Sequence, residues 1–158
     1  MRQILLTAIL SSALTCAVFL KDKILGKKKR RRALGVIPAR YASTRFPGKP
    51  LTMILGKPMI QRTYEQALQA KQLDKLVVAT DDFRIEKACK QFGAEVVMTS
   101  VECPNGTQRC SEALDALKES FDIVVNIQGD EPLIEPEIID EVVLSLKNSP
   151  DAVYSTPW

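Results

Sequence analysis

The chain has 158 residues, of which 46% are hydrophobic, which is enough for the core of one domain and argues against wholesale disorder. Residues 1–32 hold nine of the 22 lysines and arginines but one acid, so residues 33–158 carry 13 bases against 18 acids and give a nucleic-acid surface no compositional support. The absence of histidine and of any CxxC pair among four cysteines excludes the usual zinc sites and Ser-His or Cys-His catalytic pairs.

The first predicted element is an apolar segment at residues 4–20, which contains no charged side chain. A spanning helix needs about 17 to 25 such residues. The basic residues follow this segment, which favours an uncleaved signal anchor with the body facing the cytosol. Moderate hydrophobicity favours the mitochondrial outer membrane or the endoplasmic reticulum. We expect residues 1–32 to form a membrane anchor with a basic flank. A cleaved targeting peptide and a buried core helix are the alternatives.

The basic run at residues 27–32 has more than one interpretation. Taken alone it is also typical of nuclear targeting or nucleic-acid contact. Beside an apolar helix, a role in topology and in contact with anionic lipid explains it better.

Residues 33–158 alternate continuous apolar runs of strand length with amphipathic segments of helix length. The predicted strands are Ala33–Pro38, Lys75–Thr80, Glu95–Thr99, Asp122–Gln128 and Asp151–Ser155. The predicted helices are Pro58–Lys71, Phe83–Phe92, Thr107–Ser120 and Pro136–Asn148. Continuous apolar strands indicate burial on both faces and hence a parallel sheet. The pattern predicts a three-layer α/β/α, Rossmann-like domain with ligands at the carboxyl ends of the strands.

The loop after the first predicted strand has the sequence IPARYASTRFPGKPL, which is rich in proline and positive charge. Prolines limit its conformations, so the loop can keep a bent path at small entropic cost. Arg40, Arg45 and Lys49 offer donors and charge to phosphate oxygens. A solvated basic loop is the alternative, but the position at a strand end favours polyanion binding.

This string closely resembles the signature loop of the CMP-Kdo synthetases, or 3-deoxy-manno-octulosonate cytidylyltransferases, which share a GT-A-like nucleotidyltransferase fold. With the apolar N-terminal segment, the resemblance is to a plant-like, membrane-anchored form. The loop is similar, but less so, to that of acylneuraminate cytidylyltransferases, which are the alternative within this class. The resemblance implies a CTP site that includes Pro38, Ala39, Arg40, Arg45 and Lys49.

The resemblance continues through the second predicted strand and its ATDD turn. Asp81 or Asp82 is interpreted as the N-cap of the next helix rather than as a catalytic acid.

The third loop, CPNGTQR, resembles the S-G-T-E-R turn of the family near the nucleotide base. Gly106 and Thr107 are expected to lie near the nucleotide, and Thr107 is also a candidate helix N-cap. Gln108 replaces the usual glutamate, and Cys103 lies about where bacterial members have histidine. The resemblance relates both positions to contact with the base and ribose.

The fourth loop follows a buried strand and has the sequence NIQGDEPLI, which matches the family motif in full. Its glycine turn delivers Asp130 to the open edge of the sheet. A carboxylate facing bound phosphates needs a cation between them, and Mg²⁺ is the hard, oxygen-seeking ion for that position. Asp130 is therefore the predicted metal ligand. The resemblance gives Gln128 contact with the nucleotide, while Glu131 is interpreted as structural.

The resemblance implies transfer of a cytidylyl group from CTP to Kdo, which yields CMP-Kdo and pyrophosphate. Arg40, Lys49 and Asp130 are the predicted catalytic residues, because this chemistry depends on positioning and charge neutralisation.

The resemblance runs from about Leu34 to Tyr154. Family members continue into a region that supplies a second metal-binding aspartate, most sugar contacts and a dimerising arm. We therefore expect residues 33–158 to form the CTP-binding half of the domain, with a sheet incomplete at its C-terminal end. An active enzyme, an inactive truncated isoform and a membrane-tethered interaction module all remain open.

Overall fold

The structure, a computed structural model, describes residues 30–43, 46–149, 151–152 and 155. The predicted apolar anchor at residues 4–20 lies outside them. Within the described part of the chain, no helix combines the length and the apolar character needed to cross a bilayer. The residues from Arg31 onward form one compact unit, described below.

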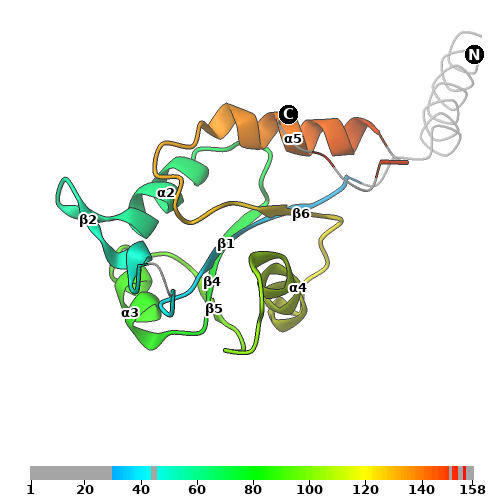
Figure 1. The fold of residues 1–158 in the computed structure, drawn as a ribbon. Coiled ribbons are helices and arrows are strands. Elements are labelled where there is room, and N and C mark those ends of the chain that lie inside the picture. The colour runs from blue at the N-terminus through cyan, green and yellow to red at the C-terminus, as the bar shows by residue number, and fades with distance from the viewer. Residues whose placement is uncertain (1–29, 44–45, 150, 153–154, 156–158) are drawn as a thin grey trace, which may run out of the picture. The chain divides into compact units, whose positions relative to one another are not determined.

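A parallel four-stranded sheet forms the centre of this unit (Figure 1). Its strands are β1 (Ala33–Ala39), β4 (Lys75–Thr80), β5 (Val96–Met98) and β6 (Ile123–Asn126), in the spatial order β5-β4-β1-β6. The chain proceeds from β1 outward to β4 and β5 and then crosses to the other side of β1. The strand order therefore reverses between β1 and β6, and such a switch point is where doubly wound sheets bind ligands.

Four of the five predicted strands are confirmed, with β4 at the predicted bounds and β5 and β6 shorter than expected. The predicted strand Asp151–Ser155 is wrong for the residues that can be described, because Asp151, Ala152 and Ser155 are not in a strand. The Ala152 amide donates to the Ser149 carbonyl at 3.0 Å, so the chain is still turning out of the preceding helix.

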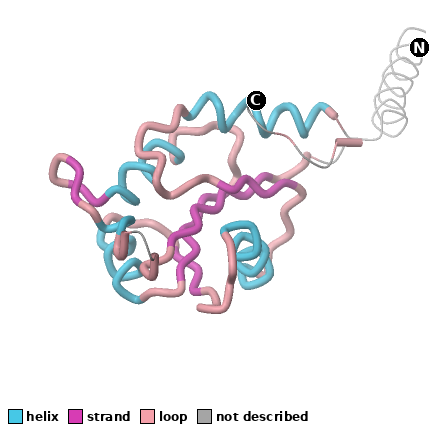
Figure 2. The backbone as a smooth tube through the Cα atoms, in the orientation of Figure 1, coloured by secondary structure: helices cyan, strands magenta, loops and turns pink. Residues whose placement is uncertain are grey.

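Helices cover both faces of the sheet, as the alternation predicts (Figures 1 and 2). On one face lie α2 (Met59–Ala67), α3 (Phe83–Gln91) and α5 (Pro136–Asn148), and on the other lies α4 (Gly106–Leu117). Successive β1 residues serve the two layers in turn: Leu34 and Val36 pack with α4, and Ile37 packs with the opposite helices. The three-layer arrangement is thereby confirmed.

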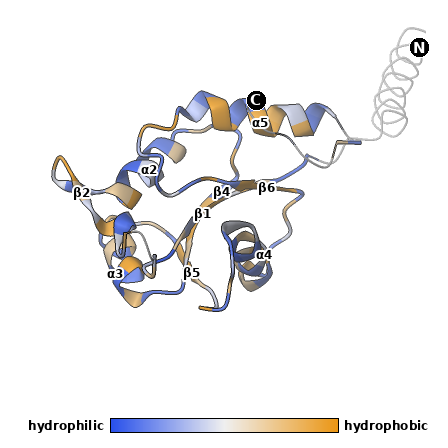
Figure 3. Ribbon diagram, viewed as in Figure 1, coloured by the Kyte–Doolittle hydropathy of each residue, from blue (hydrophilic) through white to orange (hydrophobic). Residues whose placement is uncertain are grey.

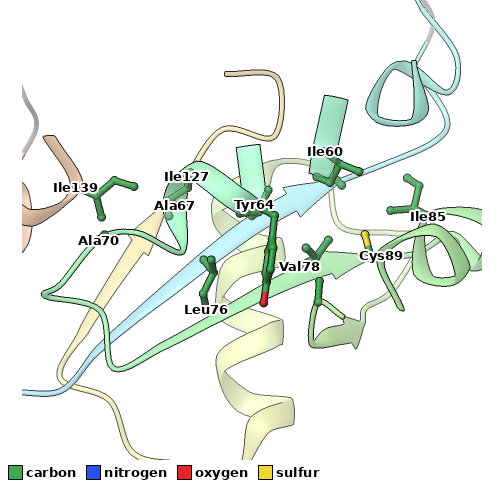
Figure 4. Close-up of a cluster of buried hydrophobic side chains, with 13 residues drawn as sticks. Ile60, Tyr64, Ala67, Ala70, Leu76, Val78, Ile85, Cys89, Ile127 and Ile139 are labelled. Carbon is green, nitrogen blue, oxygen red and sulfur yellow. The ribbon is translucent and has the colours of Figure 1, made fainter. Parts of the chain in front are cut away.

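The largest core cluster lies between the sheet and α2, α3 and α5 (Figure 4). In it, Ile60 and Tyr64 of α2 meet Val78 of β4 and Cys89 of α3. Figure 3 shows hydrophobic residues along the central strands. Burial of one such aliphatic side chain contributes about 1.5–3 kcal/mol. Burial of Cys89 raises the pKa of its thiol to about 12, which keeps this thiol neutral and unreactive.

A small hairpin was not predicted. It comprises β2 (Met53–Ile54) and β3 (Lys57–Pro58) and follows a 3₁₀ turn, η1 (Lys49–Leu51). Leu55 and Gly56 both have positive φ angles, of 46° and 79°, as a tight two-residue hairpin turn requires. The usual Asn-Gly or Asp-Gly signal is absent. Instead, the Arg62 guanidinium donates to the carbonyls of Ile54 and Leu55 at 2.7 and 2.8 Å, which holds the turn in place.

Candidate functional site

The loop after β1 and the turn after β6 meet at the switch point of the sheet. The Lys49 ammonium lies 2.5 Å from an Asp130 carboxylate oxygen, although the two residues are 81 positions apart in the chain. Their side chains are 40% and 49% exposed. Solvent therefore screens this ion pair, and breaking it costs little free energy. The predicted phosphate-binding lysine and metal-binding aspartate are thus neighbours.

Contacts from α2 and β1 hold the turn that carries Asp130. A Cβ atom on Gly129 would lie 3.2 Å from the Pro38 carbonyl oxygen, so a side chain at this position would force the turn away from β1. The buried Thr63 hydroxyl lies 3.2 Å from the Gly129 carbonyl and 3.3 Å from the Met59 carbonyl, and it donates to one of them at a time. Thr63 was not predicted, because a lone threonine on the apolar face of a helix does not differ from an ordinary core residue in the sequence.

The N-terminus of α3 braces the basic loop. The Arg84 guanidinium stacks on the Tyr41 ring, with its central carbon 3.3 Å from the ring centroid. Arg84 also donates to both carboxylate oxygens of Asp82, at 2.9 and 2.6 Å, which lowers the pKa of Asp82. The loop closes where Gly48, at a φ of 71°, donates to the Tyr41 carbonyl at 2.9 Å. Asp82 accepts from the Arg84 amide, so its predicted N-cap role is confirmed.

The other predicted residues of the basic loop have different surroundings. Arg40 is exposed directly after the last residue of β1. The Ala39 side chain is 4% exposed and packs in the core, so its backbone alone remains for a nucleotide. The Pro38 ring lies beside Gly106 at the start of α4. Arg45 lies outside the described residues.

The start of α4 lies against the end of β1. A Cβ on Gly106 would lie 3.2 Å from the Pro38 ring, which shows how closely the two elements approach. Thr107 and Gln108 are exposed. The interpretation of Thr107 as an N-cap is wrong, because the Asn105 side chain accepts from the Gln108 amide at 2.9 Å and the helix begins one residue earlier.

Cys103, one of the two departures from the family pattern, has a defined hydrogen-bond partner. Its thiol donates to a Glu112 carboxylate oxygen at 2.7 Å, and the other oxygen accepts from the Ser100 amide at 2.7 Å. The Glu112 carboxylate raises the pKa of the Cys103 thiol, and the thiol in turn lowers the pKa of Glu112. The loop before α4 is therefore held by the Glu112 side chain of α4 itself.

A cavity of about 760 Å³ extends along β6 from this region. Polar side chains at its wall include Thr107, Asn126, Gln128 and Glu131, and apolar side chains from α4 and α5 supply much of the remainder. Gln128 and Thr107, both predicted to contact the nucleotide, thus share one cavity.

The residues at the switch point fit a hard cation that is shared with phosphate. Asp130 offers exposed carboxylate oxygens, which Mg²⁺ prefers. Within the described part of the chain, no group of three or more acidic or sulfur ligands gathers into a dedicated metal cage. Mg²⁺ is commonly bound by one or two carboxylates together with substrate phosphates and water, and Asp130 suits that mode.

The model of the family described as "Cytidylyltransferase" matches residues 34–157. The chain therefore belongs to the cytidylyltransferase family.

Two curated relatives indicate a more specific class of cytidylyltransferase. The chain is 67% identical to 3-deoxy-manno-octulosonate cytidylyltransferase of Zea mays, over 80% of this chain and 43% of that protein. It is 65% identical to the mitochondrial enzyme of that name from Arabidopsis thaliana, over 82% of this chain and 45% of the relative. The resemblance to CMP-Kdo synthetases is thus confirmed. The chain spans about half the length of the curated relatives it matches.

A solved structure shows the same fold. It is described as CMP:2-keto-3-deoxy-manno-octonic acid synthetase complexed with CTP and is 45% identical, with a TM-score of 0.73. The match covers 76% of this chain and 49% of that one. The α/β nucleotidyltransferase fold expected from the sequence is confirmed.

Proposed function

We propose that this chain forms the CTP-binding part of an enzyme that joins Kdo to CTP, yielding CMP-Kdo and pyrophosphate for lipopolysaccharide or cell-wall polysaccharide synthesis. The observation that carries the proposal is the Lys49–Asp130 pair at the switch point of the sheet. Relatives named for this reaction and a similar structure described as complexed with CTP support it.

The ion pair suggests how the site changes when it is loaded. Lys49 leaves Asp130 for the triphosphate, where Arg40 and Arg45 add positive charge. Asp130 would then hold Mg²⁺, which when bound neutralises phosphate oxygens as pyrophosphate leaves. Lys49 exchanges a carboxylate for phosphate, and Asp130 exchanges an ammonium for Mg²⁺. Neither side chain is therefore left without an opposite charge. Gly106, Thr107 and Gln128 face the nucleoside part.

We propose further that residues 1–32 anchor the chain with its body toward the cytosol, at the mitochondrial outer membrane or the endoplasmic reticulum. The run of bases after an apolar segment supports this orientation. The name of the Arabidopsis relative includes the word mitochondrial, which suits the first of the two membranes.

The enzymatic proposal is tested by incubating the purified chain with CTP, Kdo and Mg²⁺ and measuring pyrophosphate release. We expect release that requires both substrates and is lost in Lys49→Met. Lys90→Met, which removes an exposed lysine of α3 paired with Glu86, is the matched control and should retain wild-type release. Tight CTP binding without turnover would instead identify a chain that binds nucleotide but does not catalyse the transfer. Absence of both would contradict the proposal.

The exposed edge of β6 favours a second candidate, a membrane-tethered interaction module. Only β1 pairs with β6 among the described strands, and the apolar cavity runs along this edge between α4 and α5. An open edge offers unpaired backbone groups to another strand. The partner we propose is a full-length cytidylyltransferase chain, and its co-purification with this chain would support the module. A monomer that stays unpaired when mixed with the full-length chain would contradict it.

A further inference from the structure

Arg109 is the one charged residue among the buried side chains of the described part of the chain, with 3% of its side chain exposed. One guanidinium nitrogen lies 2.5 Å from the Thr99 hydroxyl oxygen, and the other lies 3.1 Å from an Asp81 carboxylate oxygen. Burial of a charged pair is costly unless the geometry satisfies both partners. The two directed contacts provide that geometry.

The two partners of Arg109 come from the ends of neighbouring strands. Asp81 directly follows β4, and Thr99 directly follows β5. The Thr99 amide also donates to the Thr80 carbonyl at 2.9 Å, so the two strand ends are already joined to each other. Arg109 lies in the first turn of α4, and its guanidinium therefore fastens this helix to both strand ends.

The same helix turn carries residues of the proposed nucleotide site. Gly106 packs against Pro38 so closely that a Cβ atom would come within 3.2 Å of the proline ring. Thr107 lies at the wall of the cavity that also includes Gln128. The contact with Pro38 and the guanidinium contacts of Arg109 thus both hold the start of α4, and little freedom remains for Thr107 to shift.

We propose that Arg109 is a positioning residue for the nucleoside side of the CTP site. It fixes the distance of Gly106 and Thr107 from the end of β1, while the Lys49–Asp130 side is held independently by α2 and α3. This inference rests on the proposed function. The nucleoside part of the site, and not the phosphate part, depends on the contacts of Arg109.

The nucleoside part and the phosphate part of the site can be tested separately with two ligands. CTP contains both the nucleoside and the phosphates, whereas pyrophosphate contains the phosphates alone. The affinities of the full chain for CTP and for pyrophosphate, each with Mg²⁺, would be measured by isothermal titration calorimetry. Arg109→Lys keeps the charge but replaces the planar guanidinium, whose two nitrogens contact separate partners, with a single ammonium. Asp81→Asn keeps the arginine and removes the charge of its partner. Lys90→Met again serves as the control for loss of a helical charge away from the site.

We expect Arg109→Lys and Asp81→Asn to weaken CTP binding by about tenfold and to change pyrophosphate binding by less than about twofold. Equal weakening of both ligands would overturn the inference, as would a lower melting temperature with unchanged CTP affinity. A wild-type chain that binds pyrophosphate but not CTP would overturn the proposed function, and the inference with it. If one variant fails to fold, the other still decides the outcome.

Discussion

Two ion pairs lie at the carboxyl edge of the same sheet, and they differ in burial. Lys49 and Asp130 are 40% and 49% exposed, whereas Arg109 and Asp81 are 3% and 12% exposed. The exposed pair joins two of the predicted catalytic residues. The buried pair joins residues to which the sequence assigned no chemical role.

The difference in burial indicates different roles for the two ion pairs. An exposed pair contributes little free energy, so its partners can separate and take up phosphate and a cation at small cost. A buried pair cannot lose one partner without leaving a charge in a poorly solvated place. The first pair is therefore suited to bind ligand, and the second to keep the surrounding loops fixed.

The largest effect on stability is expected when the buried pair is broken. Arg109→Met removes the guanidinium and leaves the Asp81 carboxylate and the Thr99 hydroxyl without their partner. We expect the free energy of unfolding to fall by about 3–5 kcal/mol. Urea unfolding followed by circular dichroism measures this. A loss below about 1 kcal/mol would mean that the pair does not differ from a surface one.

A smaller effect is expected at the hydroxyl that holds the Asp130 turn. Thr63→Val keeps the shape of the side chain but removes the hydroxyl that lies within hydrogen-bond distance of the partly buried Gly129 carbonyl. We expect a loss of about 1 kcal/mol in the free energy of unfolding, together with weaker CTP binding in the presence of Mg²⁺. Serine at this position keeps the hydroxyl and should preserve CTP affinity better than valine. Equal CTP affinity in the valine variant would show that α2 does not position the turn.

The contact between Asp82 and Arg84 at the start of α3 predicts that the free energy of unfolding depends on pH. Asp82→Ala removes the N-cap and the partner of Arg84, and we expect a loss of about 1 kcal/mol at pH 7. Arg84 lowers the pKa of Asp82 in the folded state, so this stabilisation is present above the ordinary aspartate pKa of about 3.9 and is lost as the pH falls through the lowered value. Unfolding curves at several pH values should therefore converge for wild type and variant in acid. A constant difference would contradict the ion-pair contribution.

The smallest effect on stability is expected at the exposed pair. Lys49→Met should change the free energy of unfolding by less than about 1 kcal/mol. The same variant should nevertheless lose most of its affinity for CTP, because a phosphate partner is removed. A large loss of stability would show that the pair supports the fold and would remove the contrast with Arg109.

The sequence predicted the elements whose signals are local and strong. Continuous apolar runs identified β1 and β4, and proline at the first position identified the start of α5 at Pro136. The hairpin of β2 and β3 was not predicted, because its Leu-Gly turn lacks the usual Asn-Gly or Asp-Gly signal. The turn depends instead on Arg62, which lies in α2. The N-cap of α4 was placed two residues too late because Asn105 and Thr107 are both good caps in isolation.

The chemical residues of the site were predictable in part. The resemblance indicated Lys49 and Asp130, but their mutual contact depends on strand order, which one sequence does not specify. Thr63 and Arg109 act through partners 66 and 28 positions away. Their contribution comes from tertiary contacts, and no local pattern distinguishes them from ordinary helix residues.

The proposed site requires that Asp130 exchanges Lys49 for a cation when CTP binds. Calorimetric titration of CTP into the wild-type chain and into Asp130→Asn, with and without Mg²⁺, tests this directly. We expect Mg²⁺ to raise the CTP affinity of the wild type by at least about tenfold, and that of the variant by less than about twofold. An equal effect of Mg²⁺ on both chains would contradict the account.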